Sequence, residues 1–89
     1  MARYEMTTDD MFAPVGTISG SDALFELGLS YASGRDGTID LVMAHKWFNL
    51  AALRGNEAAK HFRQEIGAEL TRAEIARAQK LAREWLATH

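Results

Sequence analysis

Small residues recur at helical spacing through residues 23–59, and aromatic side chains stand among them. Two helices can approach to the short end of the usual separation of about 8–10 Å only where the side chains between them are small. The recurrence therefore predicts two closely packed helices, with Tyr31 and Trp47 filling the space between them. The pattern consists of Ala23, Leu27, Gly28, Tyr31, Gly34, Asp40, Ala44, Trp47, Ala51, Ala52, Gly55, Asn56 and Ala59.

Start and stop signals delimit this pair of helices. The first is expected to begin near Ser21 and to end at Gly34, in the left-handed conformation of a C-cap. The second is expected over about residues 40–54, with Asp40 as its N-cap and Gly55 after its end. At about 100° per residue, the inward faces are predicted to hold Ala23, Leu24, Leu27 and Tyr31 on the first helix and Ala44, Trp47, Phe48, Ala51 and Ala52 on the second.

Two further helices are expected in the C-terminal third of the chain. One spans about residues 57–67, and the next opens with a capping box in which Thr71 and Glu74 cap each other's backbone. An apolar stripe on this last helix is predicted to face inward, whereas Arg72, Arg77, Lys80 and Arg83 face water. The stripe consists of Ile75, Ala78, Leu81, Ala82 and Trp85. No strand pattern occurs, so the fold class expected is all-α with about four helices.

The spacing over residues 23–59 resembles a Sel1-like repeat, a relative of the tetratricopeptide repeat. A second repeat is incomplete, because residues 61–64 replace the Leu-Gly and Tyr that it would need. Residues 70–85 resemble the helix that often closes bacterial Sel1-like proteins. The resemblance implies an α-hairpin repeat fold with a C-terminal capping helix over residues 20–89. It also implies an adaptor or scaffold that binds an unidentified protein partner.

Residues 1–19 are expected to form an N-terminal arm that ends in an apolar strap, residues 11–18, in which Pro14 and Gly16 prevent a regular helix. The chain has 89 residues, which is enough for a single core. It contains no cysteine, no run of about 20 apolar residues and no export signal, so a cytoplasmic protein without a membrane span is expected.

Residue patterns that carry chemistry are sparse. Glu57, His61 and Glu65 would share one helical face, but we interpret them as a solvated face with i,i+4 pairing rather than a metal site. His45 is placed on the polar side of its helix. No nucleophile–base pair and no phosphate-binding loop is present, so neither an enzyme nor a cofactor is expected.

A nucleic-acid-binding regulator is the alternative function. The last two helices loosely resemble a helix-turn-helix, and the second of them carries the four basic residues named above. The net charge of −2 and the acidic residues Glu69, Glu74 and Glu84 oppose this interpretation, so no nucleic-acid partner is expected.

Two sets of residues are candidates for protein contacts. Phe25, Glu26, Leu29 and Ser30 would face a ligand groove on the first helix, unless the strap covers Phe25 and Leu29 as ordinary core. A second apolar set on the second helix could pair two copies of the chain in a homodimer; the rival is a monomer in which the other helices cover it. This set comprises Val42, Met43, Leu50 and Leu53.

Overall fold

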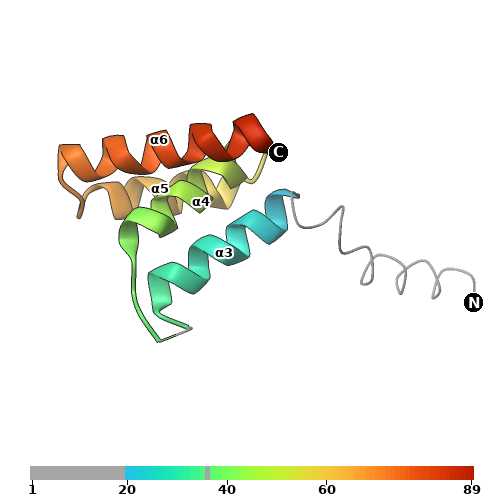
Figure 1. The fold of residues 1–89 in the computed structure, drawn as a ribbon. Coiled ribbons are helices and arrows are strands. Elements are labelled where there is room, and N and C mark those ends of the chain that lie inside the picture. Colours follow the sequence, from blue (N-terminus) through green and yellow to red (C-terminus); the bar gives the residue numbers. More distant parts are fainter. Residues whose placement is uncertain (1–19, 36) are drawn as a thin grey trace, which may run out of the picture.

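The computed structural model describes residues 20–35 and 37–89, and the described part of the chain contains four helices and no strand (Figure 1). They are α3 (Ser21–Ser33), α4 (Leu41–Leu53), α5 (Glu57–Gly67) and α6 (Arg72–Thr88). The predicted all-α fold of about four helices is confirmed. The predicted arm and strap, residues 1–19, lie outside the described residues.

Helix α4 is the centre of the arrangement and packs against each of the other three helices. Successive helices run in opposite directions, so that α3 and α4 form one antiparallel hairpin and α5 and α6 form another (Figure 1). Helices α3 and α6 flank α4 on two sides, while α5 lies behind it in this view. The outer side of α3 is therefore left without a helical neighbour among the described residues.

The ends of the first hairpin follow from local capping, as predicted. Gly34 takes a left-handed φ of 72°, and its N–H donates to the carbonyl oxygen of Ser30. Asp40 caps α4, because its carboxylate accepts a 3.1 Å hydrogen bond from the N–H of Met43. After α4 the chain turns through Gly55, whose φ of 99° favours glycine.

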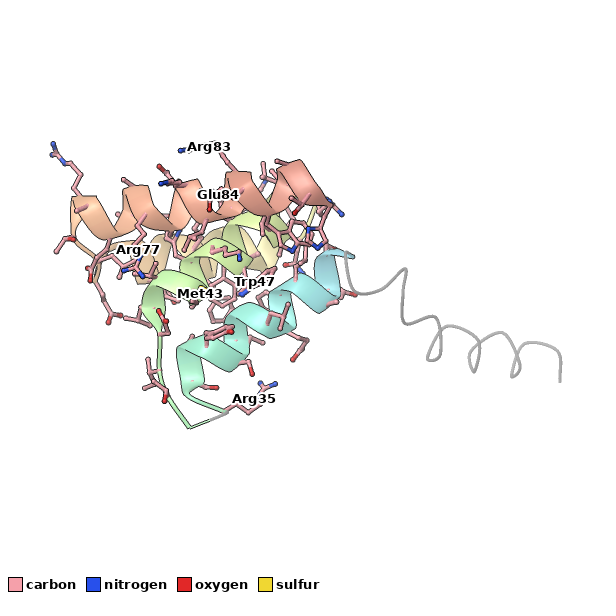
Figure 2. The ribbon with its side chains drawn as sticks, in the orientation of Figure 1. Arg35, Met43, Trp47, Arg77, Arg83 and Glu84 are labelled. Carbon is pink, nitrogen blue, oxygen red and sulfur yellow. The ribbon has the colours of Figure 1, made fainter. Side chains whose placement is uncertain are left out.

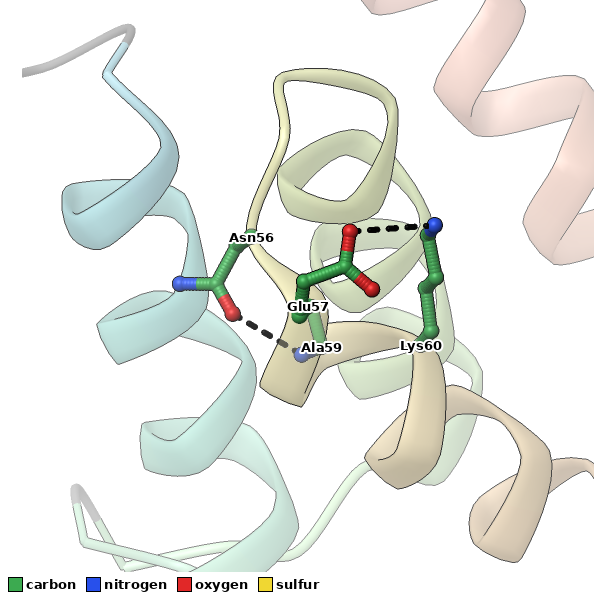
Figure 3. Close-up of polar contacts among 4 residues, drawn as sticks. All are labelled: Asn56, Glu57, Ala59 and Lys60. Atoms are coloured by element: carbon green, nitrogen blue, oxygen red, sulfur yellow. Dashed lines mark hydrogen bonds and ion pairs between the residues drawn. The ribbon is translucent and has the colours of Figure 1, made fainter.

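The second hairpin is capped in the same way. Asn56 Oδ1 accepts a 2.9 Å hydrogen bond from the N–H of Ala59 at the start of α5, where Glu57 also pairs with Lys60 (Figure 3). The capping box predicted for α6 is confirmed by two hydrogen bonds. The N–H of Glu74 donates to Thr71 Oγ1 over 3.1 Å, and the N–H of Thr71 donates to Glu74 Oε1 over 2.8 Å.

The core lies between α4 and its neighbours and is built from small residues around aromatic rings. Phe48 is fully buried, with ring centroids 5.6 Å from Phe25 and 5.4 Å from Phe62. Gly28 allows the close approach of α3, because a Cβ there would lie 2.5 Å from two atoms of the Phe48 ring. The buried cluster comprises Leu24, Ala44, Phe48, Leu50, Ala51, Ala52, Ala59, Ile66 and Ala82.

Three predicted inward residues of the first hairpin are placed differently. Ala23 is half-buried on the outer side of α3, beside Leu27, so its predicted inward position is wrong. Trp47 is only half-buried at the edge of the core, where its ring meets Trp85 at 5.8 Å. Leu27 is 37% exposed on the outer side of α3, so its predicted inward position is wrong. The cause is Gly28, because the contact between its bare backbone and Phe48 turns the Leu24–Gly28 side of the helix toward α4.

The predicted faces of α6 are largely confirmed. Ala78 and Ala82 are buried, and the larger residues of the stripe, Ile75, Leu81 and Trp85, are half-buried. The four basic side chains predicted to face water are all exposed.

Candidate functional site

The outer side of α3 carries a groove of about 340 Å³. Its apolar centre is Leu27, flanked by the small side chains of Ala23 and Ser30, and its charged rim consists of Glu26 and Arg35. These residues share one side because positions 23, 26, 27 and 30 follow the i, i+3, i+4, i+7 spacing of a helix face. We refer to Ala23, Glu26, Leu27, Ser30 and Arg35 as the α3 face.

The rim charges form an exposed ion pair. Arg35 Nη1 lies 3.5 Å from Glu26 Oε1, and their side chains are 55% and 62% exposed. Arg35 extends away from the other helices at the end of α3 (Figure 2). An exposed pair of this kind contributes only about 0–1 kcal/mol to stability, so either charge can re-pair with a partner at little cost.

The groove contains half of the predicted ligand-facing set. Glu26 and Ser30 line it, as expected. Phe25 and Leu29 instead pack partly buried against the core, and Phe25 contacts the rings of Phe48 and Phe62. Their predicted place in the groove is therefore wrong, because they lie on the side of α3 that turns toward α4 and α5. Leu27 takes the apolar position that sequence reasoning assigned to Leu29.

The residues predicted for self-association on α4 do not form one surface. Leu50 is fully buried in the core, so it is not available to a second chain, and this prediction is corrected. Val42 and Met43 are half-buried, and Met43 lies between α3 and α6 (Figure 2). Leu53 is 62% exposed near the C-terminal end of α4. The set divides because helices pack on more than one side of α4.

A second groove, of about 410 Å³, lies where the start of α4 meets the α5–α6 turn. Val42, Ile39 and Leu70 contribute apolar surface to it. Its acidic residues include Asp40 and Glu74, whose carboxylates already accept hydrogen bonds from the backbone at the starts of α4 and α6. These groups serve the fold, which leaves the α3 face as the stronger candidate for recognition.

The buried histidine of α4 was missed by sequence reasoning. His45 is only 5% exposed rather than on a polar side, and its Nδ1 has no hydrogen-bond partner among the described residues. Burial lowers its pKa, and the nearby guanidinium of Arg63 lowers the pKa further. The spacing of His45, Phe48 and Ala52 as i, i+3, i+7 was the signal that could have placed it inward.

The lowered pKa of His45 links stability to pH. The unfolded chain takes up a proton at this residue near its ordinary pKa of about 6.5, whereas the folded chain takes it up only at lower pH. The contribution of neutral His45 to the free energy of unfolding is therefore complete above about pH 6.5. It is lost as the pH falls from there toward the lower pKa of the folded chain.

The metal-like set on α5 is engaged in ordinary pairing. His61 Nε2 lies 2.9 Å from Glu65 Oε2, and Glu57 pairs with Lys60 instead of approaching the imidazole. These side chains are exposed. Within residues 20–35 and 37–89, no group of three His, Asp or Glu side chains is placed to hold a metal ion.

Comparison with models of known families, with curated proteins and with solved structures finds no match to this chain. The resemblance to a Sel1-like repeat therefore rests on the residues alone. Across the described part of the chain, no helix combines the length and apolar character that a membrane crossing requires.

Proposed function

We propose that this chain is a protein-interaction module, an adaptor or scaffold built on a Sel1-like repeat and its partial second copy. The two antiparallel hairpins support this interpretation (Figure 1). Gly28 lies directly against the Phe48 ring, and Ala44 and Ala51 are fully buried, so small residues stand where the helices pack. The chain has no cysteine and needs no disulfide, which is compatible with a reducing compartment, and its last helix resembles the one that closes bacterial Sel1-like proteins; we therefore place the adaptor in the bacterial cytoplasm.

The observation that carries the proposal is the α3 face. An apolar side chain, Leu27, stands in a groove between small residues and inside a charged rim formed by Glu26 and Arg35. Protein contacts commonly combine a desolvated apolar centre with a polar rim. The face needs a partner that supplies an apolar side chain to the groove and charges complementary to the rim.

A capture experiment with the immobilised full-length chain tests the proposal. Leu27→Asp places a charge in the groove, and Leu53→Asp makes the same change at an exposed leucine outside it. A partner should be retained by the wild type and by Leu53→Asp and lost with Leu27→Asp. Capture that is equal for all three folded proteins would reject the α3 face as the recognition surface.

Nucleic-acid binding is the alternative function to be tested alongside. Arg72, Arg77, Lys80 and Arg83 are exposed on α6, and Arg83 points away from the bundle (Figure 2). Glu84 follows Arg83 in the chain and adds a negative charge to the same helix. Titration with labelled DNA should give no specific binding, whereas an affinity that falls steeply with salt would favour this function instead.

A further inference from the structure

The α3 face has a residue spacing that would allow a second copy of itself to pack against it. Ala23, Leu27, Ser30 and Gly34 follow the 4-3-4 spacing of a coiled-coil seam, and Leu27 is the only large residue among them. Ile39, which is 60% exposed, lies beside Gly34 at the C-terminal end of the helix. In an antiparallel pair, Leu27 of one copy would meet Ser30 of the other, and Ile39 would approach the small Ala23.

The charges on the rim also favour the antiparallel direction. Pairing position 27 with position 30 sets Glu26 of the second copy opposite position 31, about 7.5 Å along the helix axis from Glu26 of the first copy. Arg35 follows the end of α3, and its guanidinium reaches back to Glu26 of its own chain, so Glu26 of the second copy is within reach of the same side chain. A parallel pair would instead bring Glu26 beside Glu26 and Arg35 beside Arg35. Because the intrachain pair is exposed, exchanging it for a pair between copies costs little.

We propose that a second copy of this chain binds the α3 face, antiparallel, around a two-fold axis between positions 28 and 29. Each copy then offers the other the same surface, the commonest way in which soluble proteins pair. This inference rests on the proposed function, because it names a second copy of the chain as a partner of the α3 face. Helix α3 has 13 residues and is about 20 Å long, so the contact is small and the dimer should dissociate on dilution.

Sedimentation equilibrium over a concentration series tests the contact. The wild-type mass should rise with concentration from the monomer value of 9.9 kDa toward twice that value. Leu53→Asp should follow the same curve, whereas Leu27→Asp should weaken dimerisation at least tenfold. Circular dichroism confirms that each variant is folded. A wild-type chain that stays monomeric at millimolar concentration, or a dimer lost only with Leu53→Asp, would overturn the proposal.

Cysteine cross-linking tests the orientation without introducing a charge. The natural chain has no cysteine, so every disulfide can be assigned. In the antiparallel pair, position 23 lies opposite position 34 of the other copy and one residue from its position 33, whereas the two positions 23 lie about 16.5 Å apart along the helix axis. A mixture of full-length Ala23→Cys and Ser33→Cys chains should therefore form the mixed disulfide on mild oxidation, because a disulfide needs Cα atoms within about 7 Å.

The background rate of disulfide formation is measured with a mixture of Ala87→Cys and Ser33→Cys chains. Ala87 is exposed on α6, away from the α3 face. Rapid linking of Ala23→Cys to itself would indicate a parallel pair. Linking of the 23–33 mixture no faster than the background would exclude a contact between the two faces. Either result overturns the proposal even if Leu27→Asp fails to fold.

Failure of this inference can be told apart from failure of the proposed function. A monomeric chain that captures another protein through Leu27 keeps the adaptor function and rejects the self-pairing. A chain that dimerises through Leu27 but captures no other protein keeps the self-pairing and rejects the adaptor function. A third outcome is a monomer in which a cysteine introduced by Ser30→Cys does not react with thiol reagents. The groove would then be covered by the chain itself, and both the self-pairing and the adaptor function would be rejected.

Discussion

Gly28→Ala tests the closest contact in the core. The added Cβ would lie 2.5 Å from Cδ1 and Cε1 of Phe48, about 1 Å inside an ordinary carbon–carbon contact of about 3.5 Å. The Phe48 ring is fully buried and stands against Phe25 and Phe62, so it has no free space to enter. Helix α3 must therefore move away from α4, and the contacts around Leu24 are weakened with it.

The size of the effect follows from two opposing contributions. Alanine in place of glycine within a helix stabilises by up to about 1 kcal/mol. Overpacking of a buried contact costs about 1–3 kcal/mol, and the rigid ring places this site at the upper end. The free energy of unfolding should therefore fall by about 2 kcal/mol, which lowers the Tm of a domain of this size by about 8–16 °C.

Thermal and urea unfolding followed by circular dichroism measure this change. The matched control is Gly67→Ala at the last position of α5, where an added Cβ would lie 3.8 Å from Nε2 of His45, an ordinary contact. This variant should be as stable as the wild type or slightly more stable. A Gly28→Ala protein as stable as Gly67→Ala would refute the close packing of α3 on Phe48.

Three further predictions concern the caps, the core and the buried histidine. Thr71→Ala removes half of the capping box and should lower the free energy of unfolding by about 1 kcal/mol in urea titrations; an unchanged midpoint would contradict a role for the cap. Phe48→Ala should cost about 3–5 kcal/mol, and Trp47→Ala less because that ring is only half-buried; the reverse order would contradict the core described above. Lowering the pH below about 6.5 should reduce wild-type stability through His45 by no more than about 1.4 kcal/mol per pH unit, and His45→Gln should remove that part of the dependence. Parallel stability–pH curves for the two proteins would show that His45 does not contribute.

The helices and their ends could be predicted because the signals are local. Asp40, Asn56 and Thr71 each bind a backbone N–H three residues ahead, and Gly34 ends α3 through a conformation that glycine adopts without strain. Such interactions do not depend on what lies elsewhere in the chain. The same holds for the stripe of α6, where apolar and charged positions alternate clearly enough to identify one inward side.

The orientation of α3 and α4 was decided only by tertiary packing. Both helices carry apolar side chains on more than one side, so periodicity alone offered several inward faces. The contact of Gly28 with Phe48 selected one of them, which buried Leu24, drew Phe25 into the core and left Leu27 exposed in the groove. Packing by α3, α5 and α6 on different sides of α4 buried His45 and Leu50 and left Leu53 exposed. A helix that is apolar all round specifies that it will be buried, but only its neighbours determine which side chains remain outside to meet a partner.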